Sequence, residues 1–287
     1  MNNTLEDGSG PKLVYASVFG CILALGLPLN AVSLWTLVRH HSLKSPSAVY
    51  MVNLAISDLL LVISLPMRIY FYATDTWSLG VLECNLTTML FRNNIRSSAF
   101  FITFISVDRL LAVVYPLRSR YLRTSYNAWK AAAIVWLSVV AMNIPEGLEF
   151  SEMLKTQSIN QSSCFEYVVI PHRPVMSYIF SVLVFIMLAV NIVCTVMVSW
   201  TLNRHLSDSA RVNNKVNVML IFIMSLVMFT VCFLPVSVGL LTVTTKIGIT
   251  PLVCLASLNC CLDPLLYYFS LDAFWKKKED VGLPRRQ

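Results

Sequence analysis

The chain has 287 residues, of which 56% are hydrophobic and 13% are charged, and its formal net charge is +7. Soluble domains carry about 25% charged residues, so this composition argues against a large soluble protein. A basic excess is compatible with a nucleic-acid partner, but here the cations gather at the ends of apolar stretches. We therefore expect membrane lipids, and no nucleic acid, around this protein.

Seven apolar stretches, each long enough for a helix to cross a bilayer, dominate the sequence. A helical crossing needs about 20 mostly apolar residues. The stretches run over residues 13–38, 48–72, 81–114, 128–148, 175–202, 216–243 and 249–269. We predict an all-α membrane protein in which residues 13–270 form a seven-helix bundle. Residues 1–12 are the expected extracellular N-terminus, and residues 271–287 a short amphipathic helix and cytoplasmic tail.

The distribution of basic residues predicts the orientation in the membrane. Cytoplasmic loops carry an excess of Lys and Arg. The alternate connections of this chain carry that excess, at Arg39, Lys44, Arg118, Arg120, Arg123, Lys130, Arg204, Arg211, Lys215, Lys276, Lys277, Lys278, Arg285 and Arg286. We therefore expect a multi-pass plasma-membrane protein with its N-terminus outside the cell. Glycosylation sequons at Asn2 and Asn160 lie on segments predicted to be outside.

Two of the eight cysteines differ in position from the others. Cys84 and Cys164 both fall on the predicted extracellular side, where oxidation is favoured. We predict one disulfide between them, which ties the segment before the fifth helix to the outer end of the third. No Cys and His spacing indicates a metal site.

Charged residues inside the membrane spans are the first candidates for function, since they are energetically expensive there. They are Asp58 and Arg68 in the second stretch, Arg92, Arg96, Asp108 and Arg109 in the third, and Asp263 in the seventh. No Gly-rich phosphate loop, His-Glu-x-x-His or Gly-x-Ser-x-Gly motif is present, so we expect no enzyme. Hydrogen-bonded contacts between helices are the alternative role for Asp58 and Asp263.

Three arginines predict an anion-binding pocket in the outer half of the bundle. Arg92 and Arg96 are spaced i, i+4 and share one face of the third helix, and Arg68 lies about three turns outward from Asp58. No aspartate stands at that depth of the third helix to hold a cationic ligand. Guanidinium groups suit phosphate or carboxylate. In the alternative, a glutamate folds in and neutralises the arginines; the candidates are Glu83, Glu146 and Glu149.

Motifs that occur one per helix, and in order, resemble the rhodopsin-class G-protein-coupled receptors. They are Asn30 in Gly-Leu-Pro-Leu-Asn, Asp58 in Asn-Leu-Ala-Ile-Ser-Asp, Asp108-Arg109, Trp136, Pro235 in Cys-Phe-Leu-Pro, and Asp263 in Asp-Pro-Leu-Leu-Tyr. The resemblance covers nearly the whole chain and implies coupling to a heterotrimeric G protein. The fifth helix lacks the proline usual in the family, which implies unusual basal activity or coupling.

The resemblance also implies roles for individual residues. Arg109 would be a cytoplasmic switch held at rest by Asp108, and Tyr267 would move inward on activation. Asp58, Asn259 and Asp263 would form a buried polar cluster that holds a structural sodium ion; no other cofactor is expected. Pro235, with Phe233 beside it, would make a hinge in the sixth helix.

Within this class, the chain looks like the purinergic and lipid branch, and most like the lysophosphatidic acid receptors of type 5. Arg68 matches a branch position where a basic residue contacts the head group of the ligand. The expected ligand is therefore an anionic lipid. Receptors for lysophosphatidylinositol, kynurenate-like molecules or nucleotides, protease-activated receptors, and orphan or constitutively active receptors are the alternatives. A transporter or channel is an alternative of another class, although the two halves show no internal repeat.

Overall fold

The computed structural model describes residues 9–40, 43, 45–156, 164–165, 175–205, 212–242 and 249–269. The two glycosylation sites predicted at Asn2 and Asn160 lie outside the described residues. The amphipathic helix predicted within residues 271–287 lies outside them as well.

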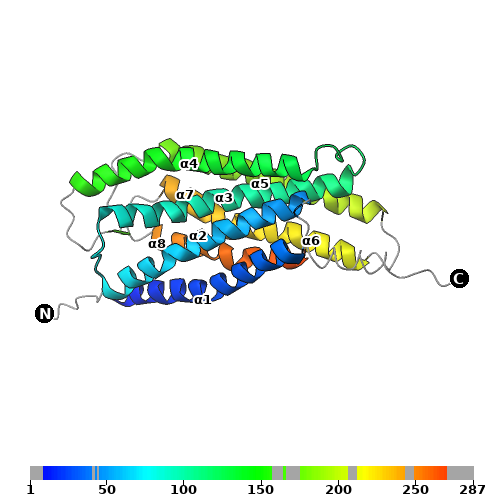
Figure 1. Ribbon diagram of the computed structural model, residues 1–287. Helices are drawn as coiled ribbons and strands as arrows, with labels where there is room; N and C mark the ends of the chain where they lie inside the picture. Colours follow the sequence, from blue (N-terminus) through cyan, green and yellow to red (C-terminus); the bar gives the residue numbers. More distant parts are fainter. Residues whose placement is uncertain are drawn as a thin grey trace.

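The described residues form a bundle of long helices that run alongside one another (Figure 1). Within the described part of the chain, seven helices are long and apolar enough to cross a membrane, in agreement with the sequence prediction. The elements are α1 (Ser9–His40), α2 (Pro46–Thr74), α3 (Val81–Val114), α4 (Ser125–Thr156), α5 (Val175–His205), α6 (Val212–Val227), the π-helical η2 (Met228–Phe233), α7 (Leu234–Thr242) and α8 (Ile249–Ser257). The sixth span combines α6, η2 and α7, and the seventh, Ile249–Phe269, contains α8 and the helical residues 259–269.

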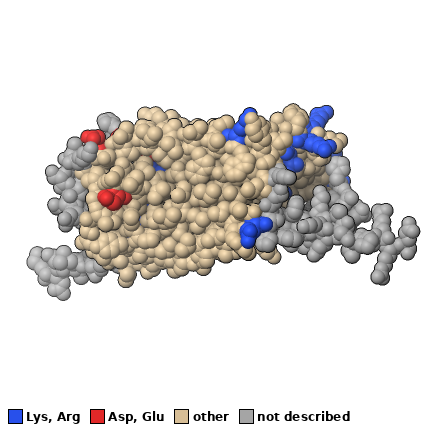
Figure 2. All heavy atoms as spheres, viewed as in Figure 1, with Lys and Arg blue, Asp and Glu red and all other residues tan. Residues whose placement is uncertain are grey.

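The surface of the bundle is divided into three zones along its length. On the face shown in Figure 2, basic side chains gather at one end, acidic side chains lie at the other, and a broad uncharged belt separates them. Large apolar side chains such as Val32, Ile63, Ile134 and Val182 are exposed on the outer faces of the helices. Such a belt suits the hydrocarbon core of a bilayer, in which helices satisfy their own backbone groups.

Helix α3 lies at the centre of the bundle, where it contacts α2, α4, α5, α6 and η2. Polar side chains connect the helices around it. The indole of Trp136 on α4 donates to the side-chain oxygen of Asn53 on α2 over 2.9 Å, and the amide of Asn30 on α1 donates to the carbonyl of Cys260 over 2.6 Å. These bonds fix the rotation of each helix and thereby decide which side chains face the interior.

The sixth span changes its helical pitch immediately before Pro235. Residues 228–233 form a π-helix, and the backbone N–H of Leu234 donates to the carbonyl of Phe229. Proline cannot donate a backbone hydrogen bond, so it weakens the helix at this point, and π-helical turns of this kind often accompany functional positions. The sequence predicted a weak point at Pro235 but not the π-helix. Phe233 ends that segment and is fully buried, with its ring 5.3 Å from Phe229.

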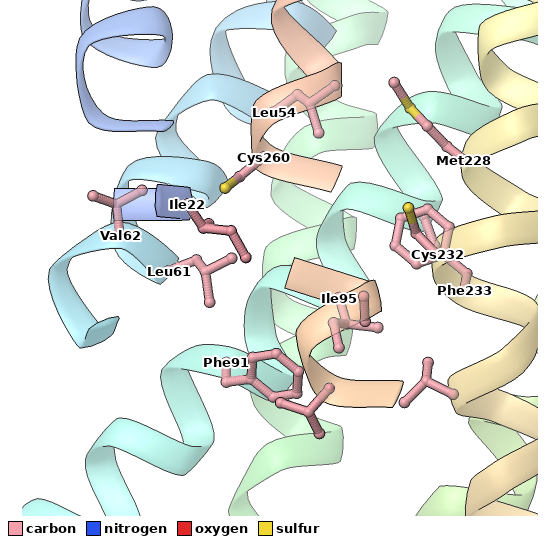
Figure 3. Packing of buried hydrophobic residues seen from close by; sticks show 14 of the residues in the cluster. Ile22, Leu54, Leu61, Val62, Phe91, Ile95, Met228, Cys232, Phe233 and Cys260 are labelled. Carbon is pink, nitrogen blue, oxygen red and sulfur yellow. The ribbon is translucent and has the colours of Figure 1, made fainter. Parts of the chain in front are cut away.

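Gly26 on α1 packs closely against the seventh span and α2. A Cβ atom on Gly26 would lie 3.0 Å from the sulfur of Cys260 and 3.3 Å from a methyl group of Val62, two members of the buried cluster drawn in Figure 3. We expect Gly26→Val to destabilise the bundle by about 1–3 kcal/mol through overpacking. Thermal unfolding in detergent micelles measures this. Gly20→Val is the matched control on the same helix, because a Cβ on Gly20 meets nothing within 4 Å. Equal losses in both variants would contradict the packing argument.

Candidate functional site

A small cavity of about 50 Å³ lies in the outer half of the bundle between α3, α4, α5, α7 and α8. Its walls are mostly apolar, and the polar exceptions are Arg92, Arg96, Glu146 and Ser177. The remaining lining residues are Phe91, Ile95, Phe180, Val236, Leu240, Ile249 and Val253. An apolar cavity with a few convergent polar groups is the usual form of a small-molecule site.

One carboxylate connects the two arginines of this cavity. Glu146 on α4 accepts from Arg92 over 2.8 Å through one oxygen and from Arg96 over 2.6 Å through the other. The two arginines lie one turn apart on the face of α3 that meets α4, as their spacing predicted. Asn143, one turn before Glu146 on α4, also accepts from Arg96. The prediction of an anion pocket without an acid at that depth is therefore wrong, because α4 turns Glu146 into it.

Arg68 occupies a separate position behind the cavity wall. Its side chain is buried, and its guanidinium lies 4.7 Å from the ring centroid of Phe91 and 4.4 Å from that of Phe165. Phe91 lines the cavity, whereas Arg68 is not among the lining residues. The structure thus brings Arg92 and Arg96 together and places the third predicted cation one aromatic ring away. Stacking between rings favours a guanidinium over an ammonium group at this position.

The predicted disulfide between Cys84 and Cys164 is confirmed, with their Cα atoms 5.7 Å apart. It joins the outer end of α3 to residues 164–165. Phe165, next to the bridge, is buried with its ring 5.3 Å from those of Phe71 and Trp77. The bridge therefore holds Phe165 over Arg68. Sequence reasoning did not single out Phe165 as a site residue, and its position directly after Cys164 was the available signal.

A fully buried polar cluster lies deeper in the bundle. Asp58, Asn259 and Asp263 are all inaccessible to solvent. Asn94 on α3, which sequence reasoning missed, joins them: its amide donates to Asp58 over 2.9 Å, and its oxygen accepts from Asn259 over 3.4 Å. The polar run at residues 92–98, in the middle of the third span, was the signal that could have found it. The three residues predicted to act together are thus brought together by α2, α3 and the seventh span.

The oxygen atoms of this cluster suit a small hard cation. One oxygen of Asp58, both oxygens of Asp263 and the oxygen of Asn259 have no hydrogen-bond partner among the described residues. Buried carboxylates are strongly unfavourable unless they are paired or protonated, and oxygen ligands are those that hard cations prefer. The donor set therefore fits a sodium ion. The described residues contain no group of three or more His, Cys, Asp or Glu that could hold another metal.

The inner end of α3 carries an ion pair that the sequence did not predict. The carboxylate of Asp108 accepts from Arg123 over 2.8 Å and 3.2 Å and also from the hydroxyl of Ser47. Asp108 is thereby joined to the loop that follows α3. The predicted restraint of Arg109 by Asp108 stays a prediction. Tyr267 is buried in the seventh span.

Comparison with known proteins accounts for this arrangement. The family model of the 7 transmembrane receptor (rhodopsin family) matches residues 29–267. The chain belongs to this receptor family. The residues of the cavity, the polar cluster and the inner ion pair all fall within the matched range, so membership supports a receptor and not an enzyme.

Individual members of the rhodopsin family are similar over most of this receptor. The mouse lysophosphatidic acid receptor 6 is 35% identical over 93% of the chain and 83% of its own length. The human lysophosphatidic acid receptor 4 is 33% identical over 96% of the chain and 79% of its own length. The bovine lysophosphatidic acid receptor 5 is 33% identical over 94% and 79%, respectively. The predicted group is confirmed, and these identities do not separate type 5 from types 4 and 6.

Proposed function

We propose that this receptor senses lysophosphatidic acid, or a closely related anionic lysophospholipid, and activates a heterotrimeric G protein. Three similar receptors carry that lipid in their names, at 33–35% identity over more than nine-tenths of the chain. The observation that carries the proposal is the buried Arg68, held against the rings of Phe91 and Phe165 directly behind the wall of a mostly apolar cavity.

The chemistry of the ligand matches these surroundings. A phosphate group offers planar arrays of acceptor oxygens to a guanidinium, which binds them more specifically than an ammonium group does. The cavity adds an apolar wall for an alkyl chain and a second guanidinium, that of Arg92. A molecule with an anionic head and a long apolar chain satisfies both parts of the site.

The signal would pass from this cavity to the inner end of the bundle. In this proposal the π-helical segment and Pro235 form the hinge of the sixth span, with the buried Phe233 at the end of that segment. Asp108, Arg109 and Tyr267 form the switch that meets the G protein, and the Asp108–Arg123 ion pair restrains it at rest. In this proposal the end of the bundle that carries the acidic side chains in Figure 2, where α1 begins, faces the outside of the cell, and the N-terminus is extracellular.

Arg68→Ala tests the proposal. We expect the potency of lysophosphatidic acid in stimulating nucleotide exchange on a G protein to fall about a hundredfold, because a charge-assisted contact is lost. Receptor abundance at the cell surface is measured in parallel. Lys12→Ala is the matched control, since Lys12 is another cation of the outer end and pairs with the exposed Asp75. An unchanged response of Arg68→Ala, at equal surface abundance, would overturn the head-group assignment.

A further inference from the structure

The two arginines that pair with Glu146 differ in their exposure and in their other contacts. Arg96 is held by the carboxylate and also by Asn143, and only 4% of its side chain is exposed. Arg92 is 16% exposed and lines the cavity. The Glu146 side chain itself is 1% exposed. Arg92 is thus the partner that faces a ligand, while Arg96 is the partner that anchors the carboxylate to α3.

The two contacts can be separated because each arginine uses a different oxygen of the carboxylate. Removing one partner of a buried ion pair is strongly destabilising when it leaves the other charge buried and unpaired. Here Glu146 would keep Arg96 if Arg92 turned away. The trio also carries two positive charges and one negative charge, so an anion that enters the cavity is attracted to it.

We propose that Glu146 is an internal counter-anion that competes with the anionic group of the ligand for Arg92. On binding, Arg92 exchanges the oxygen of Glu146 for an oxygen of the ligand, and Glu146 stays paired with Arg96. The number of ion pairs is therefore the same before and after the exchange. The chemical class of the ligand, an amphiphile with a phosphate or carboxylate head, rests on the proposed function above.

The exchange favours a phosphate over a carboxylate ligand. A phosphate monoester carries a charge of about −1.5 to −2 near neutral pH, whereas Glu146 offers a single charge, so a phosphate outcompetes it more readily. The apolar lining of the same cavity, which includes Phe180, Leu240 and Val253, accepts the alkyl chain. Glu146 therefore sets the affinity threshold that an anionic ligand has to exceed.

A double-mutant cycle with purified receptor in nanodiscs tests the proposal, with dodecyl phosphate as the probe and dodecanol as its uncharged counterpart. We expect Glu146→Gln to bind dodecyl phosphate about tenfold more tightly than the wild type. Arg92→Gln should bind it about tenfold more weakly. The double variant should match Arg92→Gln, because the competition takes place at Arg92. Dodecanol binding should be the same in all variants.

Several outcomes would overturn the proposal. Weaker or unchanged binding in Glu146→Gln would do so, as would an equal gain from Glu146→Gln in the Arg92→Gln background. If Glu146→Gln does not fold, Glu146→Asp replaces it: the shorter acid holds Arg92 less firmly, so tighter binding is again expected and weaker binding contradicts the competition. Asp75→Asn, which removes an exposed carboxylate at the outer end, is the control and should leave binding unchanged.

The same variants distinguish failure of this inference from failure of the proposed function. Nucleotide exchange stimulated by lysophosphatidic acid in the wild type tests the function, whereas binding of dodecyl phosphate tests the exchange at Arg92. If the wild type does not respond to lysophosphatidic acid, but the wild type and its variants bind dodecyl phosphate in the expected order of affinity, the assignment of lysophosphatidic acid as the ligand is refuted. The role of Glu146 as a counter-anion is then supported. If the wild type responds to lysophosphatidic acid but the variants do not follow that order of affinity, only the role of Glu146 as a counter-anion is refuted.

Discussion

Replacing Cys84 by serine is expected to destabilise the receptor and to abolish its response to an anionic lipid. The bridge closes a loop across 80 residues of sequence, for which loop-closure entropy gives about 4–5 kcal/mol in a freely unfolded chain. Helices that remain inserted in a micelle already restrict that loop, so we expect a loss of about 2–4 kcal/mol. Denaturation in mixed micelles, followed by circular dichroism, measures the loss.

The loss of response has a local cause that the stability measurement does not report. Without the bridge, Phe165 is no longer held over Arg68, and the guanidinium loses one of its two stacking rings. Phe165→Ala separates the two effects, since it removes the ring and keeps the bridge; its lipid response should weaken while most of the stability remains. Cys21→Ser is the matched control, because Cys21 is an exposed free thiol. A Cys84→Ser receptor with wild-type stability and response would refute both roles of the bridge.

The positions of the membrane spans could be predicted from the sequence, because nearly every residue of a span has to be compatible with the hydrocarbon core of the bilayer. The third span was predicted at residues 81–114 and is observed at Val81–Val114. The first was predicted at residues 13–38 and extends over Ser9–His40. Apolar composition marks the part of a helix inside the bilayer, whereas backbone hydrogen bonding continues into the polar interface.

The ion-pair partners of the buried charges could not be predicted from the sequence, because the spacing of residues along one helix does not show which residues of the neighbouring helices face them. The i, i+4 pair Arg92 and Arg96 was placed on one face correctly, but three glutamates were possible partners. Only the rotation of α4 selects Glu146. The Asp108–Arg123 pair joins a helix to the loop that follows it, 15 residues away. Such pairs are decided by tertiary packing, to which a single sequence gives no direct access.

Neutral polar residues inside the membrane spans form a second class, of which sequence reasoning missed Asn94. Asn94 contacts Asp58, Ser57, Ser98 and Asn259 and therefore connects three spans. The charged side chains in the spans were predicted as functional because a charge is energetically expensive in a membrane. The neutral amide of Asn94 is less unfavourable there and was not predicted. Buried polar networks stabilise one arrangement of the helices when each member is satisfied, so Asn94 belongs with the acids that it contacts.

The unpaired oxygen atoms around Asp58 lead to the last expectation, which concerns sodium. We expect the thermal midpoint of the wild type to be higher in about 150 mM sodium chloride than in choline chloride of the same ionic strength, at which screening is equal. A cation that binds only the folded state at ten times its dissociation constant stabilises it by about 1.4 kcal/mol. Asp58→Asn should abolish the difference between the two salts, because the amide removes one of the negative charges that attract the cation.

The same measurement separates a sodium site from simple hydrogen-bonded contacts between helices. If Asp58 only bonds with Asn94, the wild type should be equally stable in both salts, and Asp58→Asn should change its stability by the same amount in each. Asp75→Asn is the control for charge alone, because it removes an exposed carboxylate and should retain the full sodium effect. A sodium effect that survives in Asp58→Asn would place the cation elsewhere. Its loss in that variant alone would connect the orphaned oxygens of Asp58, Asp263 and Asn259 to one bound ion.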